Sequence, residues 1–432
     1  MSYVEGFFAT QHRTAIAIAC VLALSGCGAR QAIPSLSENA AGRNASAAAV
    51  ISRSHVLTWD YLGGYAGTHR ITWQQAAPWL SYAVTDAPDA SAIRAAGIKT
   101  VFYTDPNRQA PSDPEYSSDE TTFAHDCSGN RIYSTLHPTM ALMDPASNHL
   151  WSLWSDQVTA ALARSSGNFD AIFDDEADEV LQTTALPCAF DQTEWTSASN
   201  AMITSLTYPV VYNGLWAFKR KGTSWGISDV IGLNKTSIGG DLEGCYSEAP
   251  PPADGERPHG GKWVATEDTE ITMARHDRLF LCKGSNPTGA GESLAERMYM
   301  VASFLLTYDP RTSILSERFQ TPTQFHVDPE AAVVPTQPLV AEPLTIAALR
   351  TPYGLYEREY GACYVFGVNA GPCIVVVNSD DTTVLERFDK VAQYTRTLEI
   401  SGSGILDGGS LATSGPAPRE YLGGERGFIA FR

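Results

Sequence analysis

The sequence predicts a (β/α)8 TIM barrel followed by a small C-terminal antiparallel β domain. Short β-rich runs recur and many end in a polar or acidic residue, helix-like stretches lie between several of them, and strands separated by turns follow toward the C-terminus. A doubly wound open sheet is the structural alternative. We favour the barrel because no Gly-rich nucleotide-binding fingerprint follows the first strand.

Eight runs are expected to form the strands of the barrel. They cover residues 56–60, 79–84, 98–105, 169–175, 208–213, 237–243, 278–282 and 303–309. Helix-like stretches precede strands at 90–96, 148–164 and 196–206, and residues 291–302 carry apolar side chains at helical spacing. This alternation predicts a parallel sheet whose functional site lies at the carboxyl ends of its strands.

Composition divides the chain into predicted domains. Residues 1–27 are expected to be a lipoprotein signal peptide, 28–53 a flexible tether rich in Ala, Ser, Asn and Gly, and 54–325 the barrel. A Pro-rich connection then leads to short β-rich runs separated by turns. Residues 326–432 are therefore expected to hold a linker and the C-terminal β domain.

The N-terminal segment indicates export. The apolar stretch 14–24 is too short to span a bilayer as a helix, and it runs into Leu24-Ser25-Gly26-Cys27. This tetrapeptide resembles a bacterial lipobox, which implies lipidation of Cys27. An ordinary signal peptide cleaved nearby is the alternative. We expect an exported cell-envelope lipoprotein, at the outer membrane or cell surface, whose membrane association depends on the lipid anchor alone.

Cysteine usage agrees with export. Two of the eight cysteines lie in the signal, which leaves an even number for an oxidising compartment. The expected disulfides join neighbouring loops or strands and are Cys127–Cys188, Cys245–Cys282 and Cys363–Cys373. The sequence has no CxxC pair and its His residues are scattered, so we expect no metal site and no other cofactor.

Charge and aromatic content narrow the class of partner. The net charge of −18, from 30 Lys and Arg against 48 Asp and Glu, argues against nucleic acid, which needs a basic face. Aromatic residues make up 10% of the chain, including nine Trp, and they permit stacking on neutral sugars.

The segment 169–178, FDAIFDDEAD, is the most informative in the chain. A short apolar run delivers Asp174, Asp175 and Glu176 to the end of a buried strand, where desolvation and mutual repulsion oppose ionisation. A polar loop that caps a following helix would also gather acids. Alternation places Asp175 on the strand face of Phe173, and Asp174 on the opposite face, but it does not say which face meets the barrel axis.

Two strand ends offer a pair of carboxylates. Asp175 closes the fourth predicted strand and Glu243 the sixth. Glycoside hydrolysis needs one carboxylic acid to protonate the leaving oxygen and one carboxylate to attack or to activate water. We therefore expect Glu243 to be the general acid and Asp175 the nucleophile or base, with Asp174 as the second candidate for the latter role.

The string FDAIFDD resembles a strand, DGVFLD, of bacterial TIM-barrel glycoside hydrolases related to family 114, the endo-α-1,4-polygalactosaminidase group. In this resemblance Asp170 matches the leading Asp and Asp175 the carboxylate at the strand end. Segments at 124–130, 143–145, 212–214 and 240–244 fit the same layout, so the likeness spans about residues 59–309. Two positions depart from it: Ala171 replaces the usual Gly and Asp174 the usual aliphatic residue. The resemblance implies a barrel fold and a polysaccharide or oligosaccharide substrate.

Further residues near strand ends are candidates for substrate binding. Strand-end acids and an amide suit sugar hydroxyls, whereas aromatic rings suit the flat faces of sugars. The expected set is Asp60, Asp105, Asn213, Trp59, Tyr61, Tyr103, Tyr212 and Trp216. Helix capping is the alternative for the acids, and a place in the core is the alternative for the aromatic residues.

The leading hypothesis is an exported glycoside hydrolase that cleaves a polysaccharide with a pair of carboxylates. The alternative is a catalytically inactive carbohydrate-binding lipoprotein with the same cleft. A serine hydrolase or a zinc peptidase is disfavoured because the chain contains neither a GxSxG nor an HExxH motif.

Overall fold

The structure is a computed structural model, and its described residues begin at 55. The described residues are 55–60, 72–85, 89–110, 119–135, 137–177, 187–188, 190–215, 217–220, 224–227, 237–243, 245–246, 260–283, 293–317, 327–380, 384–402, 404–405 and 408–432. The predicted signal peptide (1–27) with Cys27 and the tether (28–53) lie outside them, as do Tyr61 and Trp216.

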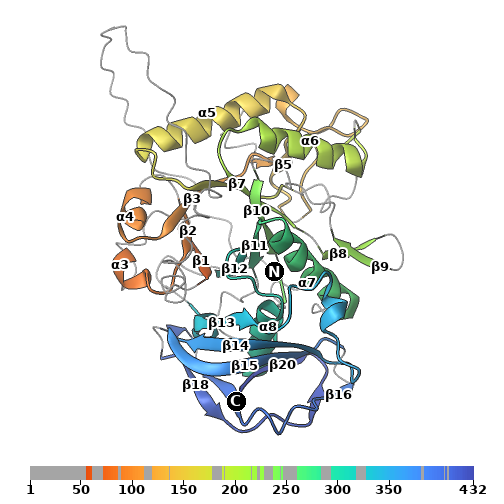
Figure 1. Ribbon diagram of the computed structural model, residues 1–432. Helices are drawn as coiled ribbons and strands as arrows, with labels where there is room; N and C mark the ends of the chain where they lie inside the picture. The colour runs from red at the N-terminus through yellow and green to blue at the C-terminus, as the bar shows by residue number, and fades with distance from the viewer. Residues whose placement is uncertain are drawn as a thin grey trace. The chain divides into compact units, whose positions relative to one another are not determined.

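Eight parallel strands close into a barrel, as the sequence predicted (Figure 1). Their order around the barrel is β1-β12-β11-β10-β7-β6-β3-β2. The strands are β1 (Val56–Asp60), β2 (Tyr82–Thr85), β3 (Lys99–Thr104), β6 (Ala171–Asp174), β7 (Val210–Leu215), β10 (Ser237–Glu243), β11 (Leu279–Lys283) and β12 (Ser313–Glu317).

Helices connect most consecutive barrel strands. They are α3 (Trp73–Ala76), α4 (Ala90–Ala95), α5 (Asn148–Arg164), α6 (Gln192–Ser205), α7 (Gly260–Arg275) and α8 (Leu294–Leu306). Between β7 and β10 the described part of the connection is a hairpin of β8 (Ala217–Arg220) and β9 (Ser224–Ile227). Capping boxes start α6 and α8, in which Asp191 and Ser293 accept from the backbone three residues on.

The prediction of an eighth strand at 303–309 is wrong. Residues 303–306 form the last turn of α8, and the eighth barrel strand is β12. The prediction failed since α8 is buried on more than one side. It packs in the main hydrophobic core and also contacts β15 and β20 of the C-terminal sheet. Every residue from Arg297 to Leu306 is buried, so the helix end lacks the polar face that distinguishes a surface helix from a buried strand.

Two apolar layers line the barrel wall. The interior is filled by Leu57, Val84, Val101, Ala171, Phe173, Val211, Leu281 and Ile314. The neighbours of these residues in sequence, such as Ile172, Val210 and Phe280, point the other way and pack in the layer that contains the helices. Alternation along each strand thus sorts side chains between the barrel interior and the outer layer.

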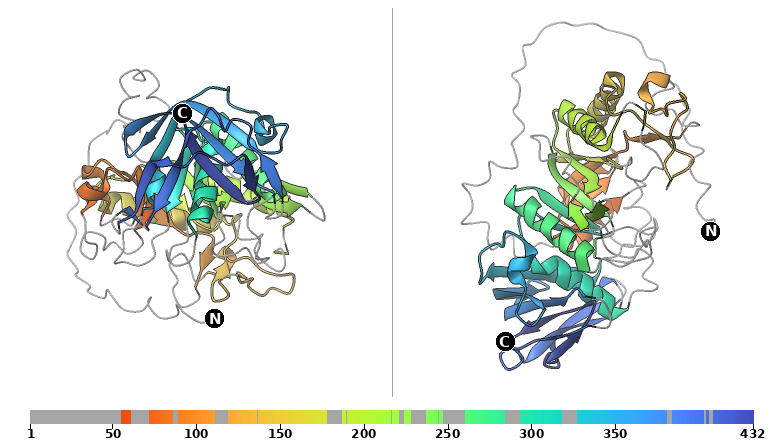
Figure 2. Two further views of the ribbon diagram at one scale, coloured as in Figure 1. Left: turned by 90° about the horizontal axis from the view of Figure 1, so that it is seen from below. Right: turned by 90° about the vertical axis from the view of Figure 1, so that its right-hand side faces the viewer.

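A small β domain follows the barrel, also as predicted. Its sheet is antiparallel, with the order β13-β14-β15-β20-β17-β18, and Figure 2 shows α8 lying against it. The strands are β13 (Val333–Pro338), β14 (Tyr356–Val365), β15 (Val368–Asn378), β17 (Arg396–Ser401), β18 (Ser410–Gly415) and β20 (Arg426–Phe431). A separate pair is formed by β16 (Leu385–Arg387) and β19 (Tyr421–Gly423), and two short 3₁₀ helices are η4 (Pro329–Ala332) and η5 (Ile346–Leu349).

Side chains of β14 cap the end of α8. The Tyr360 hydroxyl donates to the carbonyl of Leu305 at 2.7 Å, and Arg358 Nη1 donates to the carbonyl of Leu306 at 3.2 Å. The last carbonyls of a helix have no hydrogen-bond partner within the helix, and here these two buried side chains donate to them. The sheet is therefore joined to the barrel by hydrogen bonds as well as by apolar packing.

All three predicted disulfides form. The Cα atoms of Cys127 and Cys188 are 4.7 Å apart, those of Cys245 and Cys282 5.2 Å, and those of Cys363 and Cys373 5.9 Å. The first bond joins the loop after β3 to the loop after β6. It thus ties together two loops that follow adjacent barrel strands.

None of the described helices combines the length and apolarity that a membrane span requires.

Candidate active site

The structure separates the two aspartates that the sequence left undecided. Phe173 fills the barrel interior and Ile172 packs in the outer layer, so Asp175 continues the inward face and Asp174 the outward face. The contacts agree, because Asp175 meets the side chains of Tyr103 and Asn213, which come from the inward faces of β3 and β7.

The Asp175 carboxylate is held by three hydrogen bonds. The Tyr103 hydroxyl donates to Oδ2 at 2.7 Å, and Asn213 Nδ2 donates to Oδ1 at 2.8 Å. The backbone N–H of Glu176 also donates to Oδ1, at 3.1 Å. These donors fix the carboxylate plane at the mouth of the barrel and favour its charged form.

Two cations act on the same carboxylate. Arg108 lies on the short strand β4 (Arg108–Gln109), and its Nη2 is 3.7 Å from Asp175 Oδ2. Burial raises the pKa of Asp175, but the positive charges of Lys283 and Arg108 lower it again. Together with the hydrogen bonds from Asn213 and Tyr103, they leave the pKa below its ordinary value. Asp175 is therefore ionised at neutral pH although it is 8% exposed.

Asp174 has the opposite environment. Its side chain is fully buried behind the barrel wall, where Asn107 Nδ2 donates to Oδ1 at 2.8 Å. Burial raises the pKa of Asp174 well above its ordinary value; the Asn107 hydrogen bond opposes this shift, and the charges of Asp105 and Asp175 add to it. Asp174 thus favours its neutral form and does not reach the barrel mouth.

Asn107 links the two aspartates. Besides binding the Asp174 carboxyl, its Nδ2 donates to the backbone carbonyl of Asp175 at 2.7 Å. The backbone N–H of Asp175 donates to the carbonyl of Thr104 at 2.9 Å, and the Thr104 hydroxyl donates to the carbonyl of Phe173 at 2.6 Å. The strand end that carries Asp175 is therefore fixed by β3 and the loop after it.

The sequence prediction missed Lys283 and Asp241. The Nζ atom of Lys283 is 3.9 Å from Asp241 Oδ2, and Asp241 is fully buried. In the β10–β11 register, Asp241 pairs with Leu281, which is an interior residue. A signal for Lys283 existed, since it directly follows the predicted strand 278–282 and shares the parity of Leu279 and Leu281.

Arg108 was also missed, and Glu176 was named only as one of the acids at the strand end, without a role. Arg108 Nη2 is 3.3 Å from Glu176 Oε1, and Glu176 has a φ of 55°, in the left-handed region that non-glycine residues rarely adopt. Asp105 holds the same arginine, accepting from its backbone N–H at 3.2 Å and from Nε at 2.9 Å. Asp105, predicted to bind substrate, therefore positions Arg108 in this structure.

Of the remaining predicted site residues, one lies away from the barrel mouth and three have side chains outside the described part of the structure. Tyr212 is fully buried in the outer layer, on the far side of the wall from Asn213. Glu243 is the last residue of β10 and its backbone pairs with Lys283. The side chain of Glu243 lies outside the described part of the structure, as do those of Trp59 and Asp60.

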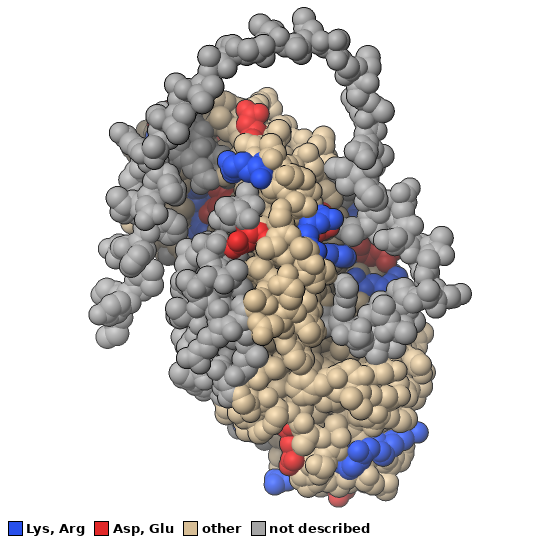
Figure 3. All heavy atoms as spheres, turned by 90° about the vertical axis from the view of Figure 1, so that its left-hand side faces the viewer, with Lys and Arg blue, Asp and Glu red and all other residues tan. Residues whose placement is uncertain are grey.

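The described residues contain no group of three or more His, Cys, Asp or Glu side chains arranged to hold a metal ion. Figure 3 shows one face of the molecule, where the basic and acidic side chains of the described residues are scattered among uncharged ones.

Comparison with known proteins finds no matching family model and no matching curated protein. Among solved structures, the glycoside hydrolase domain of PelA from Pseudomonas aeruginosa aligns with a TM-score of 0.40 at 9% identity, covering 63% of this chain and 97% of that chain. The α-galactosidase TtGalA from Thermus thermophilus aligns with a TM-score of 0.40 at 14% identity, covering 62% and 58%. Ega3 from Aspergillus fumigatus, in complex with galactosamine, aligns with a TM-score of 0.36 at 9% identity, covering 62% and 93%.

All three TM-scores are low. The evidence for the barrel is therefore its closed strand order, and the evidence for the site is the set of contacts around Asp175.

Proposed function

We propose that this protein is a glycoside hydrolase that cleaves a polysaccharide or oligosaccharide at the mouth of its barrel. The observation that carries the proposal is the Asp175 carboxylate, which stays ionised at the carboxyl end of a closed barrel and is oriented by Tyr103 and Asn213. Catalytic groups of such barrels come from the ends of several strands, which is the placement of this cluster.

Asp175 is proposed to be the nucleophile or the base. A carboxylate with a lowered pKa is suited to attack an anomeric carbon or to take a proton from water, and it is a poor proton donor. The positive charges of Lys283 and Arg108 lower the pKa of Asp175 and so favour its charged form, and Lys283 is paired with Asp241 at 3.9 Å.

Glu243 is proposed to be the general acid. It closes β10, and its backbone pairs with Lys283, whose positive charge lowers the pKa of Asp175. A separation of about 5–5.5 Å between the two carboxyl groups predicts retention of the anomeric configuration, and about 6.5–9.5 Å predicts inversion. A separation beyond about 12 Å, outside both ranges, would contradict the pairing.

The test is a screen of the purified protein against bacterial and plant polysaccharides with detection of new reducing ends. We expect release from at least one substrate and its loss in Glu243→Gln, which removes proton transfer without removing volume. A Glu243→Gln variant that cleaves this substrate at the wild-type rate would contradict the role of Glu243.

A second candidate is a carbohydrate-binding protein without catalysis. Two observations favour it: both oxygens of Asp175 already accept hydrogen bonds, and the residue is only 8% exposed. Saturable polysaccharide binding without new reducing ends, across the whole panel, would select this candidate over the hydrolase.

Export and lipidation complete the proposal. The Leu-Ser-Gly-Cys sequence after the apolar stretch supports a lipid anchor on Cys27. We expect Cys27→Ala to abolish labelling by a fatty-acid probe in the producing bacterium. Unchanged labelling and membrane fractionation of that variant would refute the anchor.

A further inference from the structure

Lys283 and Asp241 form an ion pair inside the barrel. The Lys283 Nζ atom is 3.9 Å from Asp241 Oδ2, and the two side chains are 7% and 0% exposed. In the β10–β11 register Lys283 pairs with Glu243, and Asp241 pairs with Leu281 two residues earlier in β11. Lys283 therefore starts one layer nearer to the barrel mouth than Asp241, and its ammonium reaches back toward the interior.

Lys283 acts on Asp175 through charge, from across the barrel. Strands β10 and β7 lie between β11, which ends at Lys283, and β6, which leads to Asp175. Asp175 forms its ion pair with Arg108, at 3.7 Å, and no ion pair between described residues joins it to Lys283. Burial raises the pKa of Asp175, and the positive charge of Lys283 opposes this rise more strongly than the charge of Arg108 does.

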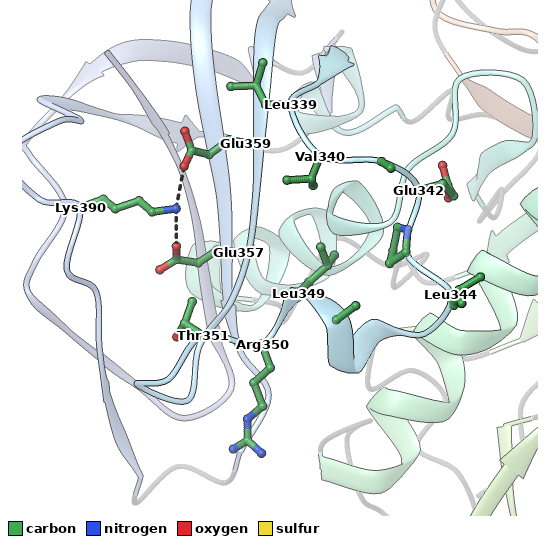
Figure 4. Close-up of a pocket in the computed structure, with 13 residues that line it drawn as sticks. Leu339, Val340, Glu342, Leu344, Leu349, Arg350, Thr351, Glu357, Glu359 and Lys390 are labelled. Atoms are coloured by element: carbon green, nitrogen blue, oxygen red, sulfur yellow. Dashed lines mark hydrogen bonds and ion pairs between the residues drawn. The ribbon is translucent and has the colours of Figure 1, made fainter.

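Another lysine of the chain shows what direct pairing looks like. In the C-terminal domain, Lys390 Nζ lies 3.0 Å from Glu357 Oε2 and 2.6 Å from Glu359 Oε1, so one ammonium contacts two carboxylates (Figure 4). A lysine side chain is long and flexible enough to find such a position. Lys283 is instead retained by Asp241, on the interior side of the barrel mouth.

A carboxylate that serves as nucleophile or base works best with a cation that is near it but not bonded to it. Asp175 Oδ2 already accepts from Tyr103, and Oδ1 accepts from Asn213. A direct bond from an ammonium would stabilise the charge but would also occupy an oxygen that has to attack carbon or take a proton. A charge held farther away favours ionisation through Coulomb attraction alone, which is strong in a buried site.

The groups that set the charge of Asp175 come from several elements. They are Tyr103 from β3, Arg108 from β4 with its partners Asp105 and Glu176, Asp174 on the opposite strand face, Lys283 from β11 with its partner Asp241, and Glu243 on β10, whose side chain lies outside the described residues. Variants of Lys283 and Asp241 leave the direct contacts of Asp175 in place, which makes their effect on it specific.

We propose that Asp241 and Lys283 are positioning residues for Asp175. Asp241 retains the Lys283 ammonium in the barrel interior, where its charge keeps Asp175 ionised without forming an ion pair with it. This role depends on the proposed function of Asp175 as the nucleophile or base, and both residues act through that carboxylate.

The test is a pH titration of the Asp175 carboxyl carbon by NMR, on the full chain with isotope-labelled aspartate side chains. Asp175→Asn identifies the signal. Lys283→Met removes the cation at similar length, Lys283→Arg keeps a cation, and Asp241→Asn removes the charge that retains it. Lys390→Met is the matched control, because it removes a lysine held by carboxylates of the C-terminal domain. Thermal unfolding of each variant verifies that it folds.

The two members of the pair should shift the titration in opposite directions. Lys283→Met should raise the pKa of Asp175 by about one unit or more, whereas Asp241→Asn should lower it because the released ammonium then pairs with Asp175. Lys283→Arg and Lys390→Met should titrate close to the wild type. On a polysaccharide that the protein cleaves, the acid limb of kcat/KM should move in the same directions. A purely structural role would produce no such opposite shifts.

A double variant separates charge from folding. Lys283→Met alone leaves a buried carboxylate without its partner, so it is also combined with Asp241→Asn. Adding Lys283→Met to Asp241→Asn should raise the pKa of Asp175, and this comparison decides the role of Lys283 if the single variant does not fold. In the Lys283→Met background Asp241→Asn should have a smaller effect than in the wild type, because Asp241 acts through Lys283.

An unchanged titration of Asp175 on loss of Lys283 overturns the proposal. So does a raised or unchanged pKa in Asp241→Asn, or a Lys283→Arg variant that titrates like Lys283→Met. The titration needs no substrate, so the opposite shifts without cleavage of any polysaccharide would support the pair and refute the hydrolase. Cleavage that Asp175→Asn abolishes, with an unchanged titration in the Lys283 and Asp241 variants, would refute the pair alone.

Discussion

At the end of β6, two adjacent aspartates have opposite environments because a strand turns successive side chains to opposite faces. Asp175 meets two cations and three hydrogen-bond donors at the barrel mouth, and its pKa is lowered although burial alone would raise it. Asp174 meets one amide behind the wall, and burial raises its pKa well above the ordinary value. One residue of register thus decides which acid is available for chemistry.

The Tyr103 hydroxyl should control the acid side of the pH–activity profile. Tyr103→Phe removes one donor to Asp175 Oδ2, which raises the pKa of that carboxyl. Activity that needs the ionised form should then be lost at a higher pH as the solution is acidified. A hydrogen bond to a charged group contributes about 1.5–3 kcal/mol, so kcat/KM should also fall about tenfold or more.

The matched control for Tyr103→Phe is Tyr82→Phe. Tyr82 also packs against the barrel interior, but its hydroxyl accepts from Lys99 rather than contacting Asp175. Tyr82→Phe should leave the pH profile unchanged. If the acid limb of Tyr103→Phe coincides with that of the wild type, Tyr103 does not tune Asp175.

Sequence reasoning identified the acidic strand end but not its surroundings. Alternation showed that Asp174 and Asp175 differ in face, and only the packing of Phe173 and Ile172 shows which face is inward. Asn107 and Arg108 come from the connection after β3, where Arg108 starts the two-residue strand β4. This connection is too short and irregular for any periodicity to indicate where its side chains point.

At the scale of elements, the seven strands that were predicted correctly have clear boundaries, since each ends near a polar residue or a turn. The prediction of the eighth strand was wrong because the C-terminal sheet covers α8. This tertiary contact cannot be predicted from the local sequence. A helix buried on several sides and a buried strand have the same composition over a few residues, and only length separates them.

The Cys127–Cys188 disulfide should restrain the loop after β3 more than the barrel itself. It closes 61 residues of sequence and joins loops that follow two adjacent strands. Cys127→Ser with Cys188→Ser should lower the free energy of unfolding by about 2–4 kcal/mol. Hydrogen exchange should quicken most in residues 119–135.

The corresponding control is Cys363→Ser with Cys373→Ser. That pair lies within the C-terminal sheet, between β14 and β15, so its removal should not change exchange in residues 119–135. Equal effects of the two double variants on that loop would show that the first disulfide has no local role.

At the scale of the whole molecule, buried carboxyls should make the fold less stable as the pH rises from mildly acidic to mildly alkaline values. Glu267 and Glu270 on α7 are fully buried and share the hydroxyl of Thr307, which donates at 2.7 Å and 2.9 Å, and Ser313 donates to Glu270 at 2.6 Å. Burial raises the pKa of Glu270 to about 8 and that of Glu267 well above its ordinary value.

Proton binding by these two carboxyls makes the free energy of unfolding fall as the pH rises. The folded state keeps protons that the unfolded state releases above its ordinary pKa, so this contribution is complete below about pH 4.5 and is lost as the pH rises through about 8. The free energy of unfolding should fall by a few kcal/mol, roughly 2–4, between pH 5 and pH 8. Denaturant unfolding at the two pH values measures it.

Amide variants test the assignment of this pH dependence. Glu270→Gln and Glu267→Gln mimic the neutral acids and should flatten the decline. Glu120→Gln is the control, because Glu120 is exposed and hydrogen bonds from Arg131 and His125 lower its pKa to about 2. Glu120 changes the free energy of unfolding only in acidic solution, between its lowered pKa and the ordinary pKa of a glutamate. Glu120→Gln should therefore leave the decline between pH 5 and pH 8 unchanged. A decline that persists in both α7 variants would assign the pH dependence to other groups.

The rate of reducing-end release by Asp175→Asn, measured beside Asp174→Asn on the first polysaccharide that the wild type cleaves, decides whether Asp175 is a catalytic residue. Asp175→Asn should lose about a thousandfold or more in turnover, because the amide can neither attack nor accept a proton. Asp174→Asn should stay within about tenfold of the wild type, because an amide resembles the neutral acid that Asp174 favours. Wild-type turnover by Asp175→Asn, or an equal loss in both variants, would contradict a catalytic role that belongs to Asp175 and not to Asp174.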